Sequence, residues 1–127
     1  MNFTGVIIEE SLKDKSVLEK VKILKTKEEP VTEGDKTPWL SKWTLHTVEV
    51  PESYADEYAE EVSRALETEH TSWYADFNND ATHYIIFADK IFKINRTKKE
   101  QYREASDHGI ALGIPPYQVD FTTLTIS

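Results

Sequence analysis

Cysteine is absent from the 127 residues of this chain. Without thiols the protein has no disulfide, no thiolate-bound zinc or iron–sulfur cluster and no cysteine nucleophile. This absence is typical of reducing compartments, so we expect a cytoplasmic protein. Glycine is scarce too, and the spacing of Gly5, Gly34, Gly109 and Gly113 fits neither the dinucleotide-binding fingerprint nor the P-loop. These observations predict no cofactor.

Long apolar runs are missing as well. No stretch approaches the roughly 18 apolar residues of a transmembrane helix, and residues 1–10 lack the basic region and apolar run of a signal peptide. We therefore expect neither membrane insertion nor secretion by that route. With 39% hydrophobic and 11% aromatic residues, the chain has the composition of a globular protein that buries one core. This predicts a single domain over residues 1–127.

Positive charge is in deficit, with a formal net charge of −8. Affinity for nucleic-acid backbones comes largely from lysine and arginine, so we predict no nucleic-acid partner. The charge is also unevenly distributed. Residues 51–80 carry nine acidic residues against Arg64, whereas residues 90–103 carry six basic residues against Glu100.

Alternation of apolar and polar residues predicts most of the strands. They are expected at 3–9, 17–31, 43–50, 72–77 and 117–121, with a loop at 32–38. Residues 17–31 also contain good helix formers, which leaves a helix there as an alternative. Residues 82–95 form either a tight hairpin or one long bent strand.

Two helices complete the expected elements. An apolar stripe predicts one helix after Pro51, formed by Ala55, Tyr58, Ala59, Val62 and Leu66. A second helix is expected from Thr97 toward Gly109. Ser53 with Asp56, and Thr97 with Glu100, match the capping-box pattern at the two starts.

The element order predicts an α+β fold. From residue 43 onward it reads strand, helix, strand, strand, helix, strand, which matches a ferredoxin-like βαββαβ arrangement with extra N-terminal strands. In that arrangement both helices lie on one face of an antiparallel sheet. The acidic helix would then lie beside the basic one, and their charges would pair at the surface.

Four phrases of the sequence carry a resemblance that covers most of the chain. They are Pro38-Trp-Leu-Ser-Lys-Trp-Thr-Leu-His-Thr-Val, Ser72-Trp-Tyr-Ala-Asp-Phe, His83-Tyr-Ile-Ile-Phe and Gly113-Ile-Pro-Pro-Tyr-Gln-Val-Asp-Phe. Together they resemble a family of small prokaryotic proteins of unassigned function. The resemblance implies no catalytic or binding motif, so no residue role follows from it.

Acidic residues and histidines are the candidates for metal binding and for acid–base catalysis. A helix end and a strand end bring together the metal candidates Glu67, Glu69, His70, Asp76 and Asp80. Their spacing matches no metal motif, and such acids are more often simply solvated, so we predict no metal site. His46 and His83 lie on expected strands, where histidines are more often structural than catalytic. Either would need a positioned carboxylate such as Asp76 for acid–base catalysis.

The aromatic residues are the strongest binding candidates. Trp39, Trp43, Trp73 and Tyr74 are large side chains of the kind enriched at binding hot spots, although they also fill cores. We therefore predict a non-enzymatic binding or regulatory domain that acts through an aromatic sheet face or a self-association surface. Its partner is then another protein or a second copy of the chain. The alternative is a small hydrolase or isomerase that uses a His–carboxylate pair in a pocket on the sheet.

Overall fold

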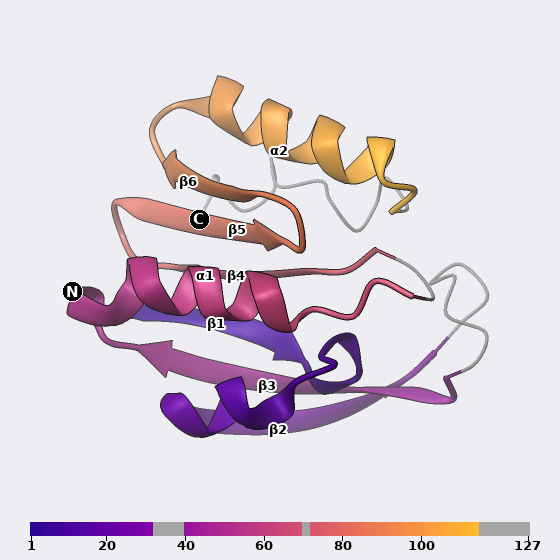
Figure 1. The fold of residues 1–127 in the computed structure, drawn as a ribbon. Coiled ribbons are helices and arrows are strands. Elements are labelled where there is room, and N and C mark those ends of the chain that lie inside the picture. The colour runs from indigo at the N-terminus through magenta and orange to yellow at the C-terminus, as the bar shows by residue number, and fades with distance from the viewer. Residues whose placement is uncertain (32–39, 70–71, 115–127) are drawn as a thin grey trace.

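The described residues form a six-stranded antiparallel sheet with two α-helices (Figure 1). This computed structural model describes residues 1–31, 40–69 and 72–114. The strands are β1 (Phe3–Ile8), β2 (Lys22–Pro30), β3 (Lys42–Val50), β4 (Tyr74–Asn78), β5 (Thr82–Phe87) and β6 (Ile91–Asn95). The α-helices are α1 (Ala55–Ala65) and α2 (Lys99–Ala111), and the 3₁₀ helices are η1 (Glu9–Ser11), η2 (Lys15–Lys20) and η4 (Glu52–Tyr54).

The strand order is β2-β3-β1-β4-β5-β6, and every neighbouring pair is antiparallel. Because β1 pairs with both β3 and β4, these two strands run parallel to each other and α1 connects them, which is a split βαβ unit. The α+β class and the antiparallel sheet are confirmed. The ferredoxin-like order is not confirmed, because three strands rather than two separate the helices. The last expected strand, 117–121, lies outside the described residues.

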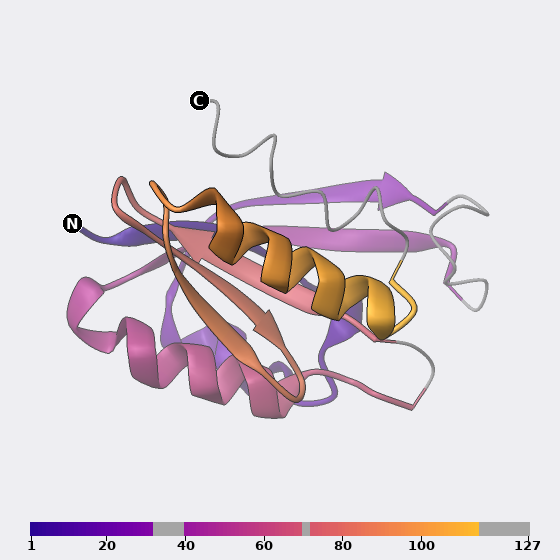
Figure 2. The same ribbon diagram turned by 90° about the horizontal axis from the view of Figure 1, so that it is seen from above.

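The two α-helices pack on opposite faces of the sheet, so the prediction that both lie on one face is wrong. Successive residues of a strand point to opposite faces. On β5, Tyr84 and Ile86 belong to the hydrophobic cluster that contains α1, whereas Ile85 and Phe87 belong to the cluster that contains α2. In Figure 2 the β5–β6 hairpin accordingly passes between the two helices.

The larger cluster lies under α1. The predicted apolar stripe of this helix is confirmed, since Tyr58 and Val62 are fully buried against the sheet. The Tyr58 hydroxyl donates a hydrogen bond of 2.7 Å to the Val17 carbonyl and so links α1 to η2. The capping box expected at Ser53 does not form, because α1 begins at Ala55 and has no side-chain cap.

Two alternatives left open by the sequence are resolved. Residues 82–95 form the β5–β6 hairpin rather than one bent strand. Residues 22–30 form the edge strand β2, whereas the preceding Lys15–Lys20 is a 3₁₀ helix capped by Asp14, whose side chain accepts from the Ser16 N–H.

The acidic helix does not lie beside the basic helix, so the expected pairing of charges between the two helices is wrong. The helices lie on opposite faces, so the acids of α1 pair with lysines on its own face. Glu61 accepts a hydrogen bond from Lys20 of η2, and Asp56 lies 3.1 Å from the ammonium group of Lys93 on β6. No helix in the described residues is long and apolar enough to cross a membrane.

Candidate functional site

The sheet face on the α2 side is only partly covered by the described residues. Over β5 and β6, Tyr102 and Ala105 of α2 pack against the strands and are fully buried. Over β1, β3 and β4 the side chains on the same face, such as Val6, Leu45 and Tyr74, are only half-buried. This region contains the candidate site.

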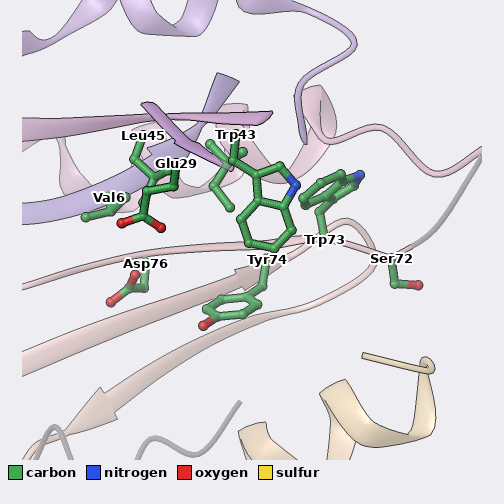
Figure 3. Close-up of a pocket in the computed structure, with 9 residues that line it drawn as sticks. Val6, Glu29, Trp43, Leu45, Ser72, Trp73, Tyr74 and Asp76 are labelled. Carbon is green, nitrogen blue, oxygen red and sulfur yellow. The ribbon is translucent and has the colours of Figure 1, made fainter. Parts of the chain in front are cut away.

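A pocket of about 420 Å³ lies on this face between β3 and β4 (Figure 3). We call it the aromatic pocket, and it is lined by Val6, Ile8, Glu29, Trp43, Leu45, Ser72, Trp73, Tyr74 and Asp76. A second hollow of about 470 Å³ shares Val6, Tyr74 and Asp76 with it. Asp76 therefore lies where the two concavities meet.

Three of the four predicted aromatic residues line this pocket. Trp43 and Trp73 meet edge to face, with ring centroids 5.6 Å apart and an angle of 65° between the rings. Trp73 is buried, and its indole N–H lies 3.1 Å from a carboxylate oxygen of Glu67. Burial, with the nearby charge of Asp76, raises the pKa of Tyr74. The fourth residue, Trp39, lies outside the described residues.

Asp76 is the carboxylate that connects the pocket to the interior. Its side chain is 22% exposed, and its Oδ2 lies 2.7 Å from Nε2 of the buried His83. The other imidazole nitrogen, Nδ1, lies 3.0 Å from the hydroxyl of Tyr102 on α2. Within the part of the chain that the structure describes, Asp76 Oδ1 accepts no hydrogen bond. The carboxylate is thus held through one oxygen while the other has capacity for a ligand.

Arg96 and Tyr102 extend this series of hydrogen-bonded side chains beyond His83. The Arg96 side chain, which can only donate, is hydrogen-bonded to the Tyr102 hydroxyl. Burial raises the pKa of the Tyr102 hydroxyl, and this hydroxyl lies 3.0 Å from His83 Nδ1. The Nε2–H of His83 donates to the Asp76 carboxylate, which can only accept. We call Arg96, Tyr102, His83 and Asp76 the donor chain.

His46 belongs to a different place. It lies on the α1 side of the sheet and is 7% exposed, with Nδ1 2.9 Å from the Thr26 hydroxyl and Nε2 3.0 Å from a Glu9 carboxylate oxygen. The sheet therefore separates His46 from Asp76. Of the two candidate histidines, it is His83 that meets the candidate carboxylate.

The candidate metal ligands are not gathered by the described structure. Asp76 lies in the middle of β4 and Asp80 in the exposed turn that follows, whereas Glu67 accepts from the Trp73 indole and Glu69 is exposed. His70 lies outside the described residues. Within residues 1–31, 40–69 and 72–114, no three acidic or histidine side chains are grouped so that they would hold a metal ion.

Several site residues were missed by the sequence reasoning. Glu29 reaches the pocket from the edge strand β2, opposite Trp43, and Tyr102 and Arg96 complete the donor chain. The alternation of Val6 and Ile8 with the buried Ile7 gave a local signal for two lining positions. The pairing of β4 with β1, which brings Val6 opposite Asp76, has no local signal.

Comparison with known proteins adds no relative. No family model, no curated protein and no solved structure matches this chain.

Proposed function

We propose that this protein is a non-enzymatic small-molecule binding domain, and that the aromatic pocket is its binding site. The observation that carries the proposal is the pocket itself. Its volume of about 420 Å³ falls in the range of about 300–1,000 Å³ that small-molecule sites occupy. Apolar walls with a few polar groups are also typical of such sites.

The walls of the pocket are better suited to binding a ligand than to packing within the hydrophobic core. Trp43 is only half-buried and presents ring surface to the cavity, and Tyr74 lines the same cavity. Large aromatic rings contribute much of the binding energy where they are desolvated by a ligand. Because the edge-to-face contact with the buried Trp73 fixes the Trp43 ring, little side-chain entropy remains to be lost on binding.

The proposal predicts which residues respond to a bound ligand. A library of small aromatic fragments, followed by amide chemical shifts in NMR spectra, should perturb residues of β1, β3 and β4 around the pocket. Trp43→Ala should weaken the binding fragments about tenfold, because it removes one wall. Ile23→Ala is the matched control, since Ile23 is an exposed apolar residue of β2 outside the pocket. Fragment binding confined to other surfaces would contradict the proposal.

A second candidate function follows from the contact between His83 and Asp76. A carboxylate held by an imidazole at 2.7 Å in a largely apolar pocket is suited to take a proton from a substrate, as in an isomerase or a small hydrolase. We rank it second because His83 is fully buried behind Asp76 and both of its ring nitrogens are engaged. Asp76 alone would contact the substrate.

Proton exchange tests this second function. In deuterated water, an Asp76 base would remove a proton from the carbon next to the carbonyl of an enolisable ketone, and solvent would return a deuteron. The wild-type chain should then accelerate deuterium incorporation, whereas Asp76→Asn should not. Equal incorporation rates with the wild-type chain, with Asp76→Asn and without protein would leave binding as the function.

The remaining features of the proposal come from composition. We propose one domain over residues 1–127 in the cytoplasm, with no nucleic-acid partner, because the chain lacks cysteine and carries a net charge of −8. Self-association through the same sheet face is the alternative use of the pocket. Sedimentation at several protein concentrations distinguishes the two, since a ligand site predicts a monomer whose pocket stays accessible.

A further inference from the structure

The aromatic pocket has two chemically different ends. In Figure 3 the carboxylates of Glu29 and Asp76 lie on one side of the cavity, as does Val6, and the indoles of Trp43 and Trp73 lie on the other. Among the described residues, the lining includes these two acids and no lysine or arginine. A ligand that fills this space therefore meets negative charge at one end and ring surface at the other.

Asp76 is oriented before any ligand binds. Within the donor chain, His83 Nε2–H donates one hydrogen bond to Asp76 Oδ2. This hydrogen bond fixes the orientation of the Asp76 carboxylate. Oδ1 accepts no hydrogen bond in the described part of the chain. A donor that enters the pocket can therefore bind Oδ1 without displacing His83.

Glu29 contributes a weaker second charge. Its Oε1 lies 3.1 Å from the ammonium group of Lys27, and its side chain is 43% exposed. The lysine offsets part of this charge, and solvent screens the rest. The side chain of Asp76 is only 22% exposed, so solvent screens its charge less than that of Glu29. Asp76 is therefore the main electrostatic feature of the pocket.

The free-energy cost of removing water from the Asp76 carboxylate determines which class of ligand binds well. An anionic ligand that seals the pocket strips water from the carboxylate and repels its charge, and a neutral donor replaces the lost water with one hydrogen bond but leaves the charge uncompensated. A cation replaces the lost water with a charge-assisted hydrogen bond.

We propose that the ligand of the aromatic pocket is a small organic monocation: an ammonium group carried on an aromatic or branched aliphatic body. The ammonium group donates to Asp76 Oδ1 on the side toward Glu29, and the body packs against Trp43 and Tyr74. This inference rests on the proposed binding function and names the class of ligand that the pocket selects.

Three matched probes test it by isothermal titration of the full chain. Phenethylammonium, 2-phenylethanol and 3-phenylpropionate share an aromatic body and differ in the charge of the polar end. We expect the ammonium to bind at least about tenfold more tightly than the alcohol, and the carboxylate to bind most weakly. The advantage of the ammonium should shrink as salt is added, because salt screens the attraction.

Variants assign the preference to its source. Asp76→Asn should reduce the preference for ammonium over alcohol to about threefold or less, with the alcohol affinity retained. Asp80→Asn is the matched control: it removes the same charge from the exposed turn after β4, outside the pocket, and should retain the full preference. Glu29→Gln should reduce the preference less than Asp76→Asn does. Circular dichroism establishes that each variant is folded.

The outcomes separate the two proposals. Equal affinities of the wild-type chain for the ammonium and the alcohol would overturn the ligand class while leaving the binding function in place. If neither probe nor any aromatic fragment binds at the pocket, the binding function itself fails. Should Asp76→Asn not fold, the comparison of the three probes on the wild-type chain still decides the question.

Discussion

Individual residues in this sheet are constrained by what lies opposite them on the neighbouring strand. Gly5 of β1 pairs with Phe77 of β4, and a Cβ built at Gly5 would lie 1.9 Å from the Asp76 carbonyl oxygen and 2.4 Å from the Phe77 Cα. Since both are backbone atoms, they cannot move aside as a flexible side chain would. Glycine is therefore needed here for the close approach of two strands, and the same approach holds Asp76 next to the pocket.

Gly5→Ala should consequently be strongly destabilising. We expect a loss of about 3 kcal/mol or more in the free energy of unfolding, because the added methyl group forces the two strands apart. Urea denaturation measures this loss. Thr4→Ala is the control, since Thr4 is exposed on the opposite face of the same strand. A loss no larger for Gly5→Ala than for Thr4→Ala would show that β1 and β4 separate easily.

At the scale of the elements, α1 is fixed by its buried stripe and by hydrogen bonds to η2, of which that of Tyr58 is buried. The Tyr58 hydroxyl donates to the Val17 carbonyl in the interior, and the ring lies in the larger hydrophobic cluster. One turn earlier in the chain, the Tyr54 hydroxyl donates to the Glu61 carboxylate in a more exposed position. The two tyrosines thus offer a buried and an exposed version of the same bond.

Tyr58→Phe should destabilise the protein by about 1–3 kcal/mol, because the Val17 carbonyl is left buried without its partner. Tyr54→Phe should cost less than about 1 kcal/mol, since water can replace the lost hydroxyl. Thermal denaturation of both variants checks the difference. Equal losses would mean that the Val17 carbonyl is reached by water after the substitution.

At the scale of the whole molecule, the described residues form two hydrophobic clusters on opposite faces of one sheet, and tyrosines belong to both or pack against them. Burial is the main cause that raises the pKa of Tyr58, Tyr74, Tyr84 and Tyr102 above the ordinary value of 10.0. The hydrogen bond to Glu61 raises the pKa of Tyr54 to about 12. The folded state therefore favours the protonated form of all five phenols.

Alkaline pH should accordingly unfold the protein. The tyrosines of the unfolded chain ionise near their ordinary pKa of 10.0, whereas those of the folded chain ionise only at higher pH. The stabilisation is therefore complete below pH 10 and falls as the pH rises above it. In a Tyr117→Phe variant, which limits the signal to the five tyrosines above, tyrosinate absorbance should appear together with the loss of circular dichroism. Ionisation near the ordinary pKa in a chain that keeps its native dichroism would contradict this.

The sequence by itself determined which residues form most strands and the first helix, because these depend on local periodicity. Its alternation predicted β1, β3, β4 and the β5–β6 segment, and the stripe from Ala55 to Leu66 predicted α1. It also predicted three of the aromatic residues that line the pocket. Local patterns failed at the helix starts, where neither expected capping box forms, since caps depend on the backbone geometry of the preceding residues.

Only the tertiary structure decided how these elements combine. The face on which each helix packs depends on strand order, and the insertion of β1 between β3 and β4 is a long-range pairing with no local signal. The same pairing brings the β4–β5 pair, with Asp76 and His83, next to the β2–β3 pair, with Glu29 and Trp43. Strand register places His46 on the opposite face from Asp76. The sequence thus predicted some of the residues that line the pocket. The separation of carboxylates and indoles to its two ends arises from contacts between residues far apart in the chain.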